Sequence, residues 1–168
     1  MPNDALKAQP HVETPETGIE PRDTAALADG LGRALADTFS LYVKTQGVHW
    51  NVVGPNFFGL HKLTEAQYED LQDAIDKIAE RIRALGYPAP AGFSEFRERS
   101  VLNAEMAIES AGEMIRELIA DNETVARRMR DFSDVAADAR DKFSEDLLIQ
   151  RMGAHEQNVW MLRALIAN

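Results

Sequence analysis

The stretch LHKLTEAQYEDLQDAIDKIAERI at residues 60–82 decides the fold of this chain. It contains no proline or glycine, and its apolar side chains return every three or four residues. The members of this stripe are Tyr68, Leu71, Ile75, Ile78 and Ile82. Such a period predicts an amphipathic α-helix. The helix should begin at the corner Gly54-Pro55 and end at Gly86, two residues before Pro88.

The same helical period continues on both sides of this stretch. Before it, a helix is predicted from a cap at Asp23-Thr24 to about Trp50. After it, the period predicts one helix from Val101 through Met129 and another from Leu148 through Ile166. No window alternates with period two, so the fold class is all-α, a four-helix bundle. The link between the second and third helices contains residues 93–96, which we expect to form a short extra helical turn.

Length and proline spacing indicate a single folded domain. The chain has 168 residues, enough to bury a core without metal or disulfide support. Residues 1–21 hold four of the seven prolines and show no apolar period, so we expect an acidic tail that is flexible or draped over a neighbour. The bundle is predicted to occupy residues 22–168.

Composition excludes several classes of function. The formal net charge is −10, which argues against a general binder of nucleic acid or of anionic membranes. Cysteine is absent, so disulfides, zinc ribbons and iron–sulfur clusters are excluded. Any metal must therefore be held by oxygen and imidazole. No apolar run of 18 residues and no leader are seen, so we expect a cytoplasmic protein without a membrane span.

Four histidines supply the imidazoles, and two of them are placed for a shared role. His49 and His61 lie on either side of the Gly54-Pro55 corner, where both can approach one metal. The alternative for His49 is a cation that stabilises the carbonyl end of a helix. His11 in the tail and His155 on an apolar stripe are expected to have no role in the chemistry.

Carboxylates on the helix that contains residues 60–82 form two separate groups. Each group is a pair spaced i,i+4 that lies along one edge of the apolar stripe. The pairs are His61 with Glu65 and Asp76 with Glu80. For Asp76 and Glu80 the alternative is an ordinary charged edge of an amphipathic helix. His61 and Asp76 are separated by a rise of about 22 Å, which is too far for one metal. If two copies pair with these helices antiparallel about a two-fold axis, each dimer contains two complete sites.

The ligand types favour one metal over others. Two neutral imidazoles, a few carboxylates and open coordination positions suit Fe(II) that reacts with an oxidant. Magnesium and calcium would require more oxygen ligands. The spacing therefore predicts an iron site shared between two subunits.

The residues at this site also resemble a known family. Four segments are similar to the signature of the Dps family of mini-ferritins. They are His49-Trp50-Asn51, Leu60-His61, residues 76–82 with the sequence DKIAERI, and residues 159–162 with the sequence VWML. The resemblance implies a ferritin-like four-helix subunit with a short helix in the B–C link, assembled as a hollow dodecamer. It also implies that the protein is a ferroxidase, which oxidises Fe(II) to Fe(III) at two-fold interfaces, preferably with hydrogen peroxide rather than dioxygen. The resemblance implies, in addition, that ferric mineral is stored inside the shell and that the cell is protected from oxidative damage.

The family's ferroxidase ligands fall on four residues of this chain by the resemblance. These residues are His49, His61, Asp76 and Glu80. Glu65 stands where the family usually has aspartate, so it is expected to be a ligand or a neighbour that acts through water. Trp50 matches an aromatic residue beside the family's iron, which intercepts oxidising equivalents; the alternative is a core tryptophan at a helix end.

Acidic three-fold pores for iron entry are a further implication of the resemblance. The pore position falls on Asp146, with nearby acidic residues at Asp138, Asp141 and Glu145. Lys142 occupies a position where another acid is often found. Negative potential in a narrow channel concentrates cations. The alternative is a solvated helix start that is stabilised by its own dipole.

Three functional hypotheses follow from the sequence. The first is a Dps-type iron oxidase and store. The second, a larger-cage ferritin, is disfavoured because its site uses Glu-x-x-His pairs, and this chain has none. The third is a non-enzymatic helical coat or nucleoid-packing protein. We expect DNA binding to be weak or absent, because residues 1–23 contain only two basic side chains and five acidic ones.

Overall fold

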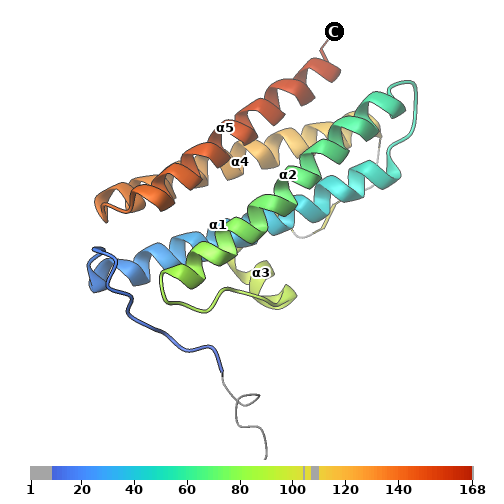
Figure 1. The fold of residues 1–168 in the computed structure, drawn as a ribbon. Helices are drawn as coiled ribbons and strands as arrows, with labels where there is room; N and C mark the ends of the chain where they lie inside the picture. Colours follow the sequence, from blue (N-terminus) through green and yellow to red (C-terminus); the bar gives the residue numbers. More distant parts are fainter. Residues whose placement is uncertain (1–8, 104, 107–109, 168) are drawn as a thin grey trace, which may run out of the picture.

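The computed structural model describes residues 9–103, 105–106 and 110–167, and this part of the chain is helical without any strand (Figure 1). The helices are α1 (Pro21–Asn51), α2 (Phe57–Ala84), α3 (Phe93–Arg99), α4 (Ala111–Asp138) and α5 (Lys142–Leu165). This confirms the predicted all-α fold. Among the described helices, none combines the length and the apolar character that crossing a membrane requires.

The four long helices form two antiparallel pairs. α1 packs along α2, α4 packs along α5, and the pairs meet mainly where α1 contacts α4 (Figure 1). The short helix α3 contacts α1 on the outside of the bundle, so the extra helix expected in the link is confirmed. The end of α2 lies beside the start of α5, where Arg81 and Asp141 form an ion pair of 2.7 Å. The α1–α2 corner is therefore at the opposite end of the bundle.

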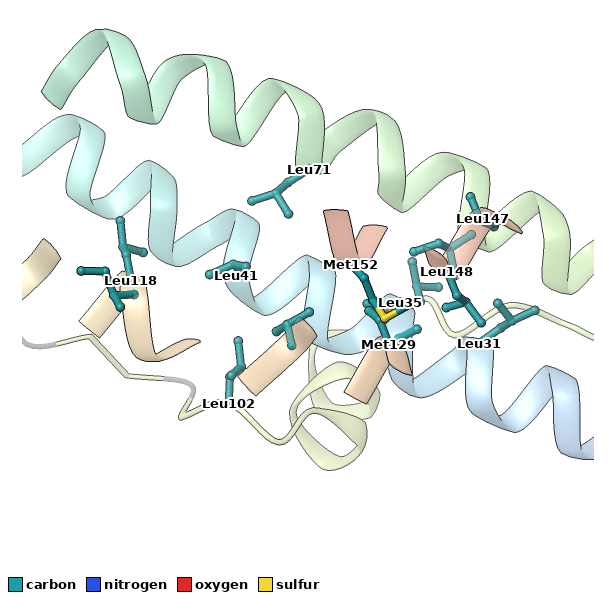
Figure 2. Packing of buried hydrophobic residues seen from close by; sticks show 14 of the residues in the cluster. Leu31, Leu35, Leu41, Leu71, Leu102, Leu118, Met129, Leu147, Leu148 and Met152 are labelled. Carbon is teal, nitrogen blue, oxygen red and sulfur yellow. The ribbon is translucent and has the colours of Figure 1, made fainter. Parts of the chain in front are cut away.

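The core is one cluster of buried aliphatic and methionine side chains, to which all four long helices contribute. Figure 2 shows Leu31 and Leu35 of α1, Met129 of α4 and Leu148 of α5 within this cluster. These side chains have no more than 2% of their surface exposed. Burying one such side chain contributes about 1.5–3 kcal/mol. The helical stripes read from the sequence thus account for the packing of the bundle.

Helix α1 begins earlier than the sequence predicted. The proposed cap at Asp23-Thr24 is wrong, because the helix starts at Pro21 with Glu20 at the N-cap position. Proline suits the first helical position, where its missing N–H would have no partner within the helix. Thr24 lies inside the first turn, and its hydroxyl donates to the carbonyl of Pro21 at 2.8 Å.

Helix α4 begins later than predicted, and Val101 does not belong to it. The backbone N–H of Val101 donates to Oδ1 of the fully buried Asp37 at 2.8 Å, which holds this residue in the link. The helix starts only after Ser110, which forms a capping box with Glu113. A serine followed three residues later by glutamate is a recognisable start signal, and it overrides the apolar period. Ala104 and Ile108, which fall within the predicted range of this helix, lie outside the described residues.

The described part of the N-terminal segment, residues 9–20, is not helical and contacts the end of α2. The backbone N–H of Glu13 donates to the carbonyl of Gly86 at 2.8 Å. Gly86 has a φ of +92°, and a Cβ there would lie 2.2 Å from the carbonyl oxygen of Glu13. Glycine is therefore required at this contact both by its backbone conformation and by space.

Candidate metal centre

The α1–α2 corner brings His49 and His61 together. His49 lies in the last turn of α1, His61 lies near the start of α2, and Gly54 between them has a φ of +114°. The two imidazole rings stack with their centroids 3.8 Å apart and their planes 17° from parallel. The structure thus places these two predicted ligands side by side within one chain.

A reciprocal pair of hydrogen bonds fixes the orientation of both rings. Nδ1 of His49 lies 2.9 Å from the carbonyl oxygen of His61, and Nδ1 of His61 lies 2.9 Å from the carbonyl oxygen of His49. A carbonyl oxygen only accepts, so Nδ1 carries the hydrogen in each ring. In the neutral imidazole this leaves the lone pair on Nε2. Histidine that ligates a metal is commonly oriented in this way by a bond from its other nitrogen.

The side chains that contact the imidazoles are two aromatic rings and one hydroxyl. Tyr68 meets His49 edge-on, with centroids 5.2 Å apart and an interplanar angle of 80°. Phe57 stacks on His61 with centroids 5.1 Å apart. The hydroxyl of Thr64 donates to the carbonyl of Leu60 and lies 3.5 Å from Nδ1 of His49. His49 is only 7% exposed, so these contacts enclose its ring within the single chain.

Glu65 lies four residues after His61 on α2, and its carboxylate forms an ion pair with Lys62. Its carboxylate accepts a 2.6 Å hydrogen bond from Lys62. This bond and the positive charge of Lys62 lower the pKa of Glu65, which keeps the group ionised. The side chain of Lys62 is more than half exposed.

Asp76 and Glu80 form a second, separate group on α2. Both are exposed and lie one turn apart on the same helix. The helical rise places Asp76 about 22 Å from His61. Within the described ranges, no group of three or more His, Asp or Glu side chains is close enough to hold a metal ion. A single chain therefore brings together the histidines but not the four predicted ligands.

Trp50 differs from the core tryptophan that was one reading of the sequence. Its side chain is 67% exposed. Among the described residues, the ring neighbours of His49 are His61 and Tyr68 and do not include Trp50.

The periodicity of α2 put Tyr68 on the apolar stripe, but its ring contact with His49 depends on how α1 and α2 cross.

The proposed pore residues lie at the other end of the bundle, near the start of α5. Asp138 and Asp146 are exposed, and Glu145 accepts a bond from Lys142 at 2.6 Å. Asp141 is 3% exposed, caps α5 and pairs with Arg81. Although burial raises the pKa of a carboxyl group, the bonds from Arg81 and Ser144 bring the pKa of Asp141 below its usual value. Its carboxylate is thus engaged within the chain.

His155 is part of the core, as the sequence indicated. It has no exposed surface, and its Nδ1 lies 2.9 Å from Oδ1 of Asn122. Burial, with the nearby charge of Arg151, lowers the pKa of His155 to about 3. His155 is therefore uncharged over the physiological range. Sequence reasoning did not single out Lys44, which is 4% exposed and forms ion pairs of 2.7 and 2.6 Å with Glu117 and Asp121 between α1 and α4.

Comparison with known proteins shows where this architecture occurs. A family model described as the ferritin-like domain matches residues 28–168. An uncharacterised low temperature-induced protein of Nostoc is 37% identical over 151 residues, which is 89% of this chain and 84% of that protein. A protein of Porphyromonas gingivalis named DNA protection during starvation protein is 33% identical over 148 residues, 88% of this chain and 93% of that one.

A solved structure matches over almost the whole chain. The Dps protein of Vibrio cholerae, described as a member of a broad superfamily of ferritin-like diiron-carboxylate proteins, superposes with a TM-score of 0.86. It is 28% identical, and the match covers 95% of this chain and 100% of that one.

Proposed function

The chain belongs to the Dps family of ferritin-like proteins, and from this membership we propose that it is a ferroxidase that oxidises Fe(II) and stores the ferric product. The family implies iron storage and ferroxidase-type activity. The observation that carries the proposal for this chain is the stacked pair of His49 and His61. Each ring is held through Nδ1 and presents Nε2 for a metal.

We propose that the complete site lies between two subunits related by a two-fold axis. The histidine half and the carboxylate half lie about 22 Å apart on α2. When two α2 helices pair antiparallel, His61 of one subunit faces Asp76 and Glu80 of its partner, and the interface contains two such sites. The exposure of Asp76 and Glu80 supports this arrangement, because their carboxylates are free to meet a partner.

The donor set suits ferrous iron as the substrate. Two imidazole nitrogens and two or three carboxylates stabilise both Fe(II) and Fe(III), and the remaining positions are open to an oxidant. Hydrogen peroxide is the preferred oxidant in this proposal. Two Fe(II) ions each give one electron to one peroxide, two protons are taken up, and two water molecules form. The Fe(III) then hydrolyses to a mineral, and the peroxide is consumed without release of a radical.

Storage requires an enclosed space and a route for iron. We propose a dodecameric shell in the cytoplasm, with Asp146, Asp138 and Glu145 at the iron channels. Asp146 and Asp138 are exposed near the start of α5, where a ring of carboxylates would raise the local concentration of Fe(II). The role in the cell is protection from oxidative damage, with DNA binding weak or absent.

Stopped-flow absorbance of ferric iron tests the function directly. Wild-type protein should oxidise Fe(II) faster with hydrogen peroxide than with dioxygen at equal concentration. The double variant His49→Ala with His61→Ala should fall to the rate of protein-free buffer. His11→Ala is a matched histidine control, because His11 is exposed in the N-terminal segment and bonds only locally. A double variant that oxidises iron at the wild-type rate would refute the site, and no rate above buffer in wild-type protein would favour a non-enzymatic coat.

A further inference from the structure

Polar side chains join α2 to α5 at successive levels along the bundle. Arg81 near the end of α2 pairs with Asp141 at the start of α5, with 2.7 Å between Nη2 and Oδ2. Further along, Arg151 of α5 pairs with Asp70 of α2, with 2.8 Å between Nη2 and Oδ2. α2 and α5 approach each other less closely than α1 and α4 do, and long polar side chains span the seam between them (Figure 1).

The two ion pairs fix the register of α2 against α5. Residue numbers fall along α2 as they rise along α5, so the helices run antiparallel. Fourteen residues before Arg81 is Gln67, and fourteen residues after Asp141 is His155. Each interval is a rise of about 21 Å and about four turns of helix. Gln67 and His155 therefore lie at the same level of the bundle, on the faces that carry the ion pairs.

Gln67 and His155 are both buried, and each has a polar atom without a partner. Gln67 is 4% exposed, and His155 has no exposed surface. Among the described residues, neither Nε2 of Gln67 nor Nε2 of His155 has a hydrogen-bond partner. The same is true of the buried Nε of Arg151, about one turn before His155 on α5. Since nearly all buried polar groups in proteins are bonded, three such atoms on one seam indicate a partner that they share.

Bonds within the core determine what each of these atoms requires. Nδ2 of Asn122 donates to the carbonyl of Leu118 at 2.8 Å, so Oδ1 is the end of this amide that accepts from Nδ1 of His155 at 2.9 Å. Burial lowers the pKa of His155 to about 3, so the ring is neutral and Nε2 carries a lone pair. Nε2 of Gln67 and Nε of Arg151 can only donate. The site thus offers two donors and one acceptor.

We propose that one water molecule is bound at this level of the seam, in the interior of the bundle. Its oxygen accepts from Gln67 and Arg151, and it donates one hydrogen to Nε2 of His155. Three bonds are the usual number for a buried water. The fixed charge of Arg151 disfavours a cation here, and the lone pair of His155 disfavours an anion. A small neutral molecule that both donates and accepts satisfies all three atoms.

The water makes a third connection between α2 and α5, beyond the two ion pairs. Gln67 lies six residues after His61 and nine residues before Asp76. The connection therefore holds the part of α2 that joins the two halves of the proposed iron site. The water site is independent of the proposed ferroxidase function, because its buried atoms lie outside the metal centre.

A high-resolution crystal structure of the full chain tests the site directly. It should show one peak of density at about 2.7–3.2 Å from Nε2 of Gln67 and from Nε2 of His155, with Nε of Arg151 as the third contact. Gln67→Met keeps the length of the side chain but removes the donor, so the peak should weaken or disappear. Gln72→Met, at an exposed position of α2, should keep it. A wild-type structure in which Gln67 and His155 bond directly, with no density between them, would overturn the proposal.

Urea unfolding gives a second test, in which the sign of the effect decides. If a water joins the two groups, Gln67→Met removes one of its bonds, and the midpoint of unfolding should fall. If Nε2 of Gln67 has no partner, the same change removes a buried, unbonded donor, and the midpoint should rise. Gln72→Met at the same protein concentration should leave the midpoint where it is in wild type. A midpoint that rises or stays unchanged in Gln67→Met refutes the water site.

Discussion

The buried His155 makes the stability of this protein depend on pH, with a magnitude that follows from its environment. Burial against Asn122 holds the pKa at about 3 in the folded chain, whereas an unfolded histidine has about 6.5. Between these values the unfolded chain binds more protons, so stability decreases as pH falls from 6.5 toward 3. At pH 5 the difference is about 1.5 pH units, which corresponds to about 2 kcal/mol at 1.36 kcal/mol per unit.

Urea unfolding of wild type and His155→Gln at pH 7 and pH 5 measures this effect. The protein concentration is kept constant, because subunit association contributes to apparent stability. Asp141, whose pKa is lowered in the folded state, also loses stability as pH falls, but it does so equally in both proteins. The loss between pH 7 and 5 should be about 2 kcal/mol larger in wild type than in the variant. Equal losses in the two proteins would refute the assignment of His155 as a buried neutral side chain.

Two substitutions and one binding assay test the fold and the surface. Asp141→Asn keeps a good helix cap but removes the charge opposite Arg81, so the free energy of unfolding should fall by about 3 kcal/mol in urea; no change would show that the ion pair is not formed. For Gly86→Ala the free energy of unfolding should fall by at least about 1 kcal/mol in the same assay, because φ at this position is positive and the added Cβ would meet Glu13. Gly59→Ala, which has open space around it, should cause no loss of stability. In a gel shift at physiological salt without divalent cations, plasmid DNA should not be retarded tightly, because the acidic N-terminal segment and a net charge of −10 offer few cations to phosphate; tight retardation would contradict this.

The helices that were predicted well are those with a long apolar stripe and clear end signals. Gly54-Pro55 and Gly86 bound α2 in the sequence, and the structure confirms a helix between them. The start of α4 was missed because the apolar period continued upstream of the true cap at Ser110. What prevents the helix there is a tertiary contact, the buried carboxylate of Asp37 on the N–H of Val101, and a local pattern does not reveal such a contact.

The same distinction applies to the site. The sequence predicts that His49 and His61 lie close together, because only a short corner separates their two helices. The stacked rings in the structure agree with this prediction. The reciprocal Nδ1 bonds and the edge-on contact of Tyr68 depend on the crossing of α1 and α2, which the sequence does not specify. The partner of Asp76 and Glu80 belongs to another subunit in our proposal, and so it lies beyond any single chain.

Subunit mixing tests the shared site most directly. One variant lacks the histidine half, with His49→Ala and His61→Ala, and the other lacks the carboxylate half, with Asp76→Ala and Glu80→Ala. Each alone should be nearly inactive in peroxide-driven iron oxidation. When the two are co-expressed in equal amounts and mix at random, about half of the two-fold interfaces pair unlike subunits, and each of these rebuilds one of its two sites.

The measurement is the rate of iron oxidation by the mixed oligomer, with mass spectrometry to show that both chains are present in it. A site shared between subunits predicts that roughly a quarter of the wild-type activity returns. A mixed oligomer that is as inactive as either parent would contradict the shared site, because a site within one subunit cannot be rebuilt from two incomplete chains.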